Sequence, residues 1–179
     1  MKSKILLAIL LLTPLIVLLT STLSFQSGFS PKYTKNNGVF FSEYFNATNL
    51  GLVDDFDTLK FDDGKWIFAT YASKNTDSKK ALYLMRQLNI ALNRDIYKLK
   101  RVIFAQEKSF ITDQLTDYPR TQTFIDSEGK LFENLIKFGD ENFFLEQKIF
   151  IIDPYGRAVM FFPVSMDAKL ILKDLKILI

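Results

Sequence analysis

The chain contains no cysteine and no histidine among its 179 residues. These two absences exclude a thiolate nucleophile, a disulfide, a thiol redox couple and an imidazole base. They also exclude zinc and blue-copper sites built on thiolate and imidazole, so only oxygen and methionine ligands remain for a metal. Few of the common enzyme mechanisms are left.

An excess of one charge is also missing, because 23 basic and 20 acidic residues give a formal net charge of only +3. This balance lacks the electrostatic footprint of a nucleic-acid-binding protein. Hydrophobic residues make up 48% of the chain and include 18 Phe, which is enough for a core of ordinary size. We therefore expect one globular domain and no nucleic-acid partner.

An uncharged segment, residues 5–31, follows Lys2 and Lys4. As a helix, residues 5–25 would be about 31 Å long, which matches the hydrocarbon core of a bilayer. We expect this segment to contact membrane lipid as an anchor. A cleaved signal peptide is the alternative, with Thr22-Leu23-Ser24 as a weak cleavage site. Lysines before the segment and no charge just after it place the N-terminus in the cytoplasm and the rest of the chain outside it.

Residues 26–37 are rich in Gly, Ser, Asn and Pro. Turn-forming residues at this density indicate a tether. We therefore expect three parts, which are a transmembrane anchor or signal peptide at 1–25, a tether at 26–37 and a folded domain at 38–179.

The clearest fold signal is a strand, a helix and a second strand. Residues 66–71 form a continuous β-branched and aromatic run, typical of a strand that is buried on both faces. Apolar residues then recur with the helical period over 76–92, and a second apolar strand lies around 102–104. Such a βαβ unit has parallel strands and a right-handed crossover.

Other elements complete the pattern. Asp153-Pro154-Tyr155-Gly156 is typical of a turn and predicts an antiparallel hairpin around it. The order βαβ, helical connection, ββα predicts an α/β fold of the thioredoxin-like type, with a mixed four-stranded sheet and helices on both faces. The remaining predicted elements are a strand at 38–44, a hairpin within 50–61, short helices at 110–115 and 130–138, strands at 149–152 and 158–162, and a helix from 166 or 167 to the C-terminus.

Four segments carry a family resemblance. Residues 65–71, 81–87 and 151–157 are similar to matching parts of membrane-anchored thioredoxin-like proteins related to the Sco/SenC copper chaperones. Asn36-Asn37-Gly38 lies where such proteins have a short Asn/His-Gly segment. The resemblance implies a single-pass protein of the bacterial inner membrane with its C-terminal domain in the periplasm. It also implies a link to the assembly of a respiratory cytochrome c oxidase.

The metal chemistry of that family is missing from this chain. In the Sco pattern a Cys-x-x-x-Cys pair follows the first central strand, and a His precedes the late hairpin. The pair would fall at Lys74 and Ser78, and residues 142–148 contain no His. A thiolate-imidazole copper site and disulfide exchange are therefore chemically excluded. We expect no catalytic residue, no metal ligand and no cofactor.

The resemblance leaves a vestigial active-site loop as a contact surface for a protein partner. Its candidate residues are Lys74, Asn75, Thr76, Ser78 and Arg86. The alternative for the loop is an ordinary helix cap, and the alternative for Arg86 is a solvated helix face.

Aromatic and methionine side chains of the periodic segments are expected in the core. Trp66, Tyr71 and Tyr83 occupy strand and helix periods, so we expect them to be buried or half-buried. Met85 and Met160 lie in apolar runs and are expected as core residues, with no role as copper ligands.

The favoured function is that of a non-catalytic accessory protein in oxidase assembly, whose partner is an oxidase subunit or an assembly factor. An exported structural domain unrelated to the oxidase is one alternative. A thioredoxin-like enzyme that works without cysteine is the other, and it is disfavoured because that chemistry needs a thiolate.

Overall fold

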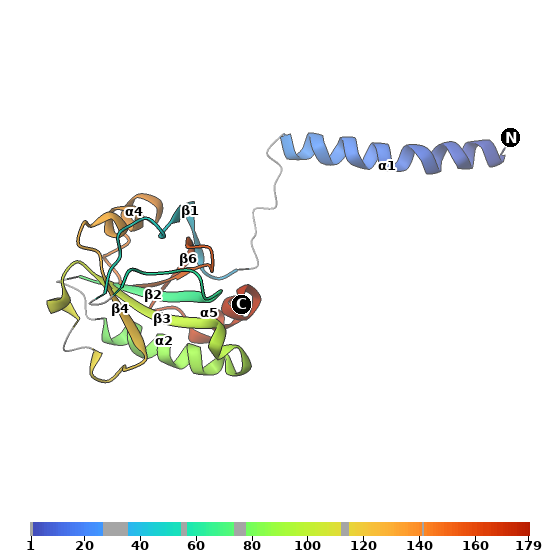
Figure 1. The fold of residues 1–179 in the computed structure, drawn as a ribbon. Coiled ribbons are helices and arrows are strands. Elements are labelled where there is room, and N and C mark those ends of the chain that lie inside the picture. Colours follow the sequence, from blue (N-terminus) through green and yellow to red (C-terminus); the bar gives the residue numbers. More distant parts are fainter. Residues whose placement is uncertain (1, 27–35, 55–56, 74–77, 112–114, 141) are drawn as a thin grey trace. The chain divides into compact units, whose positions relative to one another are not determined.

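The computed structural model describes residues 2–26, 36–54, 57–73, 78–111, 115–140 and 142–179 (Figure 1). They belong to two compact units, which lie within residues 1–35 and 36–179.

Helix α1 (Lys2–Gln26) forms the first unit. Its stretch Lys4–Ser24 has a mean hydropathy of 2.5 and is long and apolar enough to cross a membrane. The hydroxyls of Thr13 and Thr22 donate to backbone carbonyls one turn earlier, at 2.6 Å each. Because these hydroxyls are satisfied within the helix, they are compatible with a lipid environment.

A six-stranded sheet with the order β1-β6-β5-β2-β3-β4 forms the centre of the second unit. Strands β2, β3 and β4 are parallel to one another, whereas β5 pairs antiparallel with β2 and β6, and β1 with β6. The central strands β6-β5-β2-β3 form the predicted mixed four-stranded sheet, which β1 and β4 extend at its edges. The strands are β1 (Val39–Asn46), β2 (Trp66–Ala72), β3 (Leu99–Ala105), β4 (Thr121–Ile125), β5 (Lys148–Ile152) and β6 (Arg157–Pro163).

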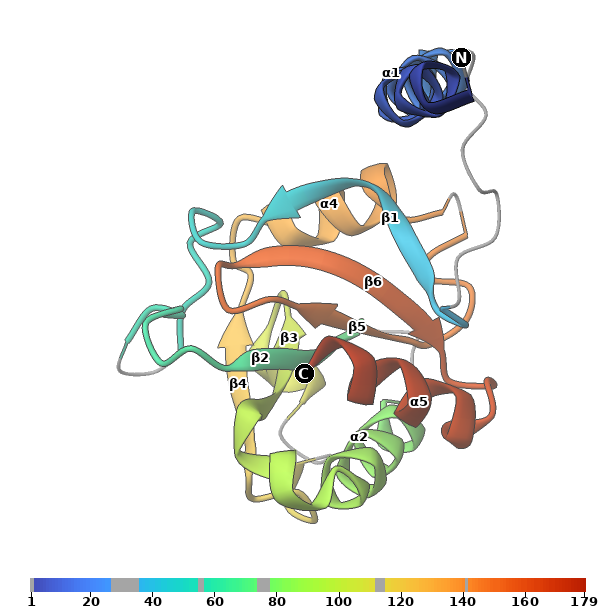
Figure 2. The same cartoon turned by 90° about the vertical axis from the view of Figure 1, so that its right-hand side faces the viewer.

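Helices cover both faces of this sheet, as predicted. Helices α2 (Lys79–Ala91) and α5 (Ala168–Leu178) lie side by side on one face (Figure 2). Helix α4 (Lys130–Phe138) lies on the other face, next to β1. Two short 3-10 segments, η1 (Asn93–Lys98) and η2 (Lys108–Phe110), flank β3.

The core consists of two apolar layers, one on each face of the sheet. Ile67 and Tyr71 of β2 belong to the layer that α4 covers. Phe68 points to the opposite face, as strand alternation requires, and packs with Met85 of α2 and Ile171 of α5. The prediction that β2 is buried on both faces is therefore confirmed, as is the burial of Met85.

The sequence analysis missed β4 and overstated the early hairpin. Strand β4 begins with Thr-Gln-Thr at an edge of the sheet, and Gln122 is exposed, so the apolar run that marks a buried strand is absent. Within 50–61 the described pairing consists of a bridge between Val53 and Thr58 and the backbone hydrogen bonds from Asp54 to Asp57 and from Leu59 to Leu52, and it forms no strand. Part of the helix expected at 110–115 falls on 112–114, outside the described residues.

One buried carboxylate holds the start of the domain. Asp174 of α5 is fully buried and accepts the backbone N–H groups of Asn37, at 2.6 Å, and of Gly38, at 2.8 Å. It also accepts the side-chain amide of Asn37 at 2.8 Å. A Cβ at Gly38 would overlap the ring of Phe162, so this position needs glycine. The segment that the resemblance marked at 36–38 is therefore bound to the last helix.

We predict that Asp174→Ala lowers the free energy of unfolding by about 2–4 kcal/mol, because three donors lose their acceptor. Urea unfolding of the full-length chain in an uncharged detergent, followed by fluorescence of the single tryptophan, Trp66, measures the change. Lys173→Ala alters an exposed neighbour on the same helix and is the control. Equal effects of the two substitutions would contradict this role of Asp174.

Candidate functional site

A polar cluster joins the carboxyl end of β2 to the segment before β5. The hydroxyl of Thr70 donates to the carbonyl of Lys148 at 2.9 Å. The side-chain amide of Gln147 donates to the Thr70 hydroxyl at 2.5 Å and to the carbonyl of Tyr71 at 3.2 Å. Its oxygen Oε1 is buried and has no donor within the described part of the chain. This cluster occupies the region where the Sco resemblance places the late histidine, and it serves to connect backbone segments.

The buried ammonium group of Lys148 is also engaged in structure. It donates to the carbonyls of Asn142, at 3.0 Å, and Phe143, at 2.8 Å, and lies 3.5 Å from a carboxylate oxygen of Asp140. The same nitrogen is 5.1 Å from the centre of the Phe143 ring. These contacts account for its three donor positions, so Lys148 holds the loop rather than serving as a nucleophile.

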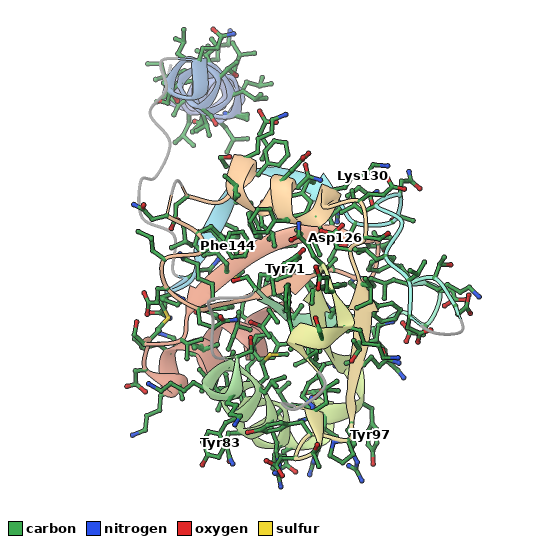
Figure 3. All side chains as sticks on the ribbon, turned by 90° about the vertical axis from the view of Figure 1, so that its left-hand side faces the viewer. Tyr71, Tyr83, Tyr97, Asp126, Lys130 and Phe144 are labelled. Carbon is green, nitrogen blue, oxygen red and sulfur yellow. The ribbon has the colours of Figure 1, made fainter. Side chains whose placement is uncertain are left out.

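A second buried group, Tyr71, is fixed by Asp126 (Figure 3). The phenol donates to Asp126 at 3.1 Å, and Asp126 also accepts the backbone N–H groups of Leu131 and Phe132 in the first turn of α4. Burial, together with the charge of Asp126 and this hydrogen bond, raises the pKa of Tyr71 above its ordinary value. The phenol therefore stays protonated and cannot act as a base at neutral pH.

The structure brings few of the predicted site residues together. Lys74, Asn75 and Thr76 lie outside the described residues. Ser78 precedes α2 directly and is fully buried, and its hydroxyl finds no hydrogen-bond partner among the residues described. Arg86 is exposed, eight residues further along, which corresponds to about 12 Å of helix. Ser78 therefore presents no polar group at the surface beside Arg86.

A shallow groove lies beside the first turns of α2, with a volume of about 470 Å³. Tyr83 in its wall is 57% exposed, so the prediction that this side chain is buried or half-buried is wrong. The reason is its place on α2, because the buried positions of the helix are Ala81, Leu82, Met85, Leu88 and Asn89. The residues that line the groove are Lys79, Lys80, Tyr83, Leu84, Tyr118 and Val164.

The surface of the groove is mainly apolar. Its wall is apolar and aromatic, and the exposed Lys80 lies at its rim. Exposed tyrosine is enriched at protein interfaces, because a large rigid ring is buried at little cost in conformational entropy. In Figure 3, Tyr83 lies on the outer surface, well apart from Tyr71 and Asp126. Trp66 is half-buried and Tyr71 is buried, as predicted.

The sequence analysis missed Gln147, Lys148 and the groove. Gln147 and Lys148 immediately precede the apolar run of β5, and two polar residues at that point are the signal that was available. Across the described ranges, the structure has no cluster of three or more acidic side chains that could hold a metal.

Solved structures with a similar fold include peroxiredoxins and Sco proteins. Peroxiredoxin Q of Xanthomonas campestris superposes with a TM-score of 0.51 and 15% identity, over 73% of this chain and 92% of that chain. A cysteine-to-serine mutant of PrxQ from Xylella fastidiosa has a TM-score of 0.51 and 16% identity, over 81% and 98%. BsSco, a member of the Sco family of cytochrome c oxidase assembly proteins, has a TM-score of 0.50 and 14% identity, over 82% and 96%.

These similarities define a thioredoxin-like α/β protein. Residues 66–179 match the family described as "transmembrane-like, thioredoxin-like, C-terminal domain", and the chain belongs to that family. No curated protein matches it in sequence. The predicted fold class is confirmed, and so is the resemblance to thioredoxin-like proteins that include Sco members, without any cysteine in this chain.

Two hydroxyls near the ends of β2 and α2 should differ in their contribution to stability. We predict that Ser78→Ala leaves the free energy of unfolding unchanged or raises it by up to about 1 kcal/mol, because a buried unpartnered hydroxyl is removed. Thr70→Val should lower it by about 1–3 kcal/mol, because Gln147 and the Lys148 carbonyl lose a partner. Urea unfolding of the full-length chain compares the two variants, and a larger loss for Ser78→Ala would contradict this account.

Proposed function

We propose that this protein is a membrane-anchored, non-catalytic accessory protein that assists the assembly of a respiratory cytochrome c oxidase through protein contacts. One observation carries the proposal. The chain combines a thioredoxin-like domain with a helix able to span a membrane, and it contains neither cysteine nor histidine. The fold is kept although the residues for thiol and copper chemistry are gone.

The chemistry of the buried polar groups supports a non-catalytic role. Lys148 is held by backbone carbonyls, and Tyr71 stays protonated beside Asp126. Thiol exchange and peroxide reduction by a thioredoxin-like protein need a thiolate. Because the chain has no thiolate, the function proposed for the domain is binding through its surface.

The groove beside α2 is the proposed contact surface. It lies at the helix whose N-terminal end would carry the cysteine pair in the Sco pattern, so a partner that approaches that end meets Tyr83 and Lys80. BsSco is named as a member of a family of oxidase assembly proteins, and this supports an oxidase subunit or an assembly factor as the partner. A partner embedded in the same membrane fits a domain tethered to α1.

The proposed membrane orientation rests on Lys2 and Lys4, which lie in the first turn of α1, before its uncharged stretch. Positive charge is retained on the cytoplasmic side, so the C-terminal domain is proposed to lie in the periplasm of a bacterial inner membrane. We predict that alkaline phosphatase fused to Ile179 is active in cells. Green fluorescent protein fused at the same position should not fluoresce, because it would be exported to the periplasm. Mass spectrometry of the mature chain reports whether the segment 1–25 remains. A bright fluorescent fusion with inactive phosphatase would contradict the orientation.

Capture of the partner tests the groove. We predict that the tagged full-length chain, isolated from solubilised membranes, retains an oxidase subunit or assembly factor and that Tyr83→Ala reduces the recovered amount about tenfold, the usual scale of an interface aromatic. Tyr97→Ala is the matched control, because Tyr97 is 81% exposed and lies outside the groove (Figure 3).

Oxidase activity in a deletion strain is the second measurement, and we expect it to fall and to be restored by the unaltered chain but not by Tyr83→Ala. If no oxidase component is captured and the deletion leaves oxidase activity intact, the assembly role is wrong. The alternative of an exported structural domain unrelated to the oxidase would then be favoured.

A further inference from the structure

Arg101 is a buried cation without an ion-pair partner among the described residues. It lies in β3, where it is 8% exposed, and alternation along the strand places it on the face that α2 covers. Its nitrogen Nη1 is buried and has no hydrogen-bond partner among the described residues. A buried charge that is neither paired nor hydrogen-bonded is costly, and native proteins rarely keep one without a ligand.

Two further arginines surround it. Arg86 of α2 and Arg120, which directly precedes β4, lie close enough to lower the pKa of Arg101, although burial is the larger cause. No carboxylate among the described residues is within ion-pair distance of any of the three guanidinium groups. Helix α2, strand β3 and the residue before β4 thus bring three positive charges together, although they are distant in sequence.

A cavity of about 370 Å³ lies among these arginines. Asp117 is the single acidic residue in its wall, against three guanidinium groups. A second cavity of about 260 Å³ shares Arg101 and Arg120 and adds Lys65 and Lys100, both of which are near Asp63. Tyr118 also lines the first cavity.

We propose that this cavity, between α2, β3 and the start of β4, binds a small anion that carries phosphate or carboxylate groups, with Arg101 at its base and Arg86 and Arg120 at its sides. Guanidinium groups match the geometry of both anions through paired N–H donors. The volume is that of a site for a small molecule or metabolite. The proposal does not depend on the assembly role, because none of the three arginines lines the groove.

Thermal unfolding of the full-length chain in uncharged detergent, followed by Trp66 fluorescence, measures binding with inorganic phosphate and with citrate as probes. A ligand that binds only the folded state raises the unfolding temperature with its concentration. Sodium chloride at matched ionic strength corrects for general salt effects. A stronger response to phosphate identifies a phosphate-bearing ligand, and a stronger response to citrate a carboxylate-bearing one.

We predict millimolar or tighter binding of at least one probe, weakened about tenfold or more by Arg101→Gln, since a hydrogen bond to a charged group is lost. Arg86→Gln and Arg120→Gln alter more exposed residues. Each should weaken binding of the probe about as much as Arg101→Gln does, without unfolding the domain. Arg94→Gln removes an exposed arginine outside both cavities and should leave binding unchanged.

Without added anion, Arg101→Gln should unfold at the same or a higher temperature than the unaltered chain, because a buried unpaired charge is removed. The site is refuted if neither probe acts beyond chloride, if Arg101→Gln binds as well as the unaltered chain, or if Arg94→Gln weakens binding equally.

Discussion

Burial of β2 on both faces is the constraint on which the rest of the domain depends. Every residue from Ile67 to Ala72 is buried, and the strand pairs with β3 on one side and β5 on the other. A strand in this position needs apolar cover above and below, which α4 supplies on one face and α2 with α5 on the other. The same strand positions Thr70 and Tyr71 near its carboxyl end, where they bond to Lys148 and Asp126.

Among the described residues, the buried charged side chains follow one rule with one exception. Lys148 has carbonyl acceptors, Asp174 accepts three donors, and Asp126 accepts a phenol and two backbone N–H groups. Each of these joins segments that are distant or irregular, so each contributes to the fold. Arg101 joins nothing among the described residues, and that contrast within a single domain is what points to a ligand rather than to a structural role.

The parts that sequence predicts well are those where burial imposes a period. The runs at 66–71 and 149–152 and the helical pattern over 76–92 identified β2, β5 and α2, and the proline-glycine turn after Ile152 identified the hairpin. Strand β4 escaped prediction because an edge strand needs no continuous apolar run. The burial of Tyr83 was predicted wrongly because this residue is adjacent in sequence to buried positions of α2. The apolar period allowed it to be counted with them, although its side chain is exposed.

The surface sites escaped prediction for a different reason. The groove and the arginine cavity are built from residues of α2, the segment 117–120 and either β3 or the loop after β6, and only the folded chain brings these together. Tyr118 lines both, so the two surfaces adjoin along α2. In a chain without cysteine or histidine, residue types alone identify no chemistry. The informative properties are the exposure of each side chain and whether its polar atoms have hydrogen-bond or ion-pair partners. An exposed tyrosine in a groove and a buried arginine without an acceptor among the described residues are abnormal by those measures, and the two cavities that they line both include residues of α2.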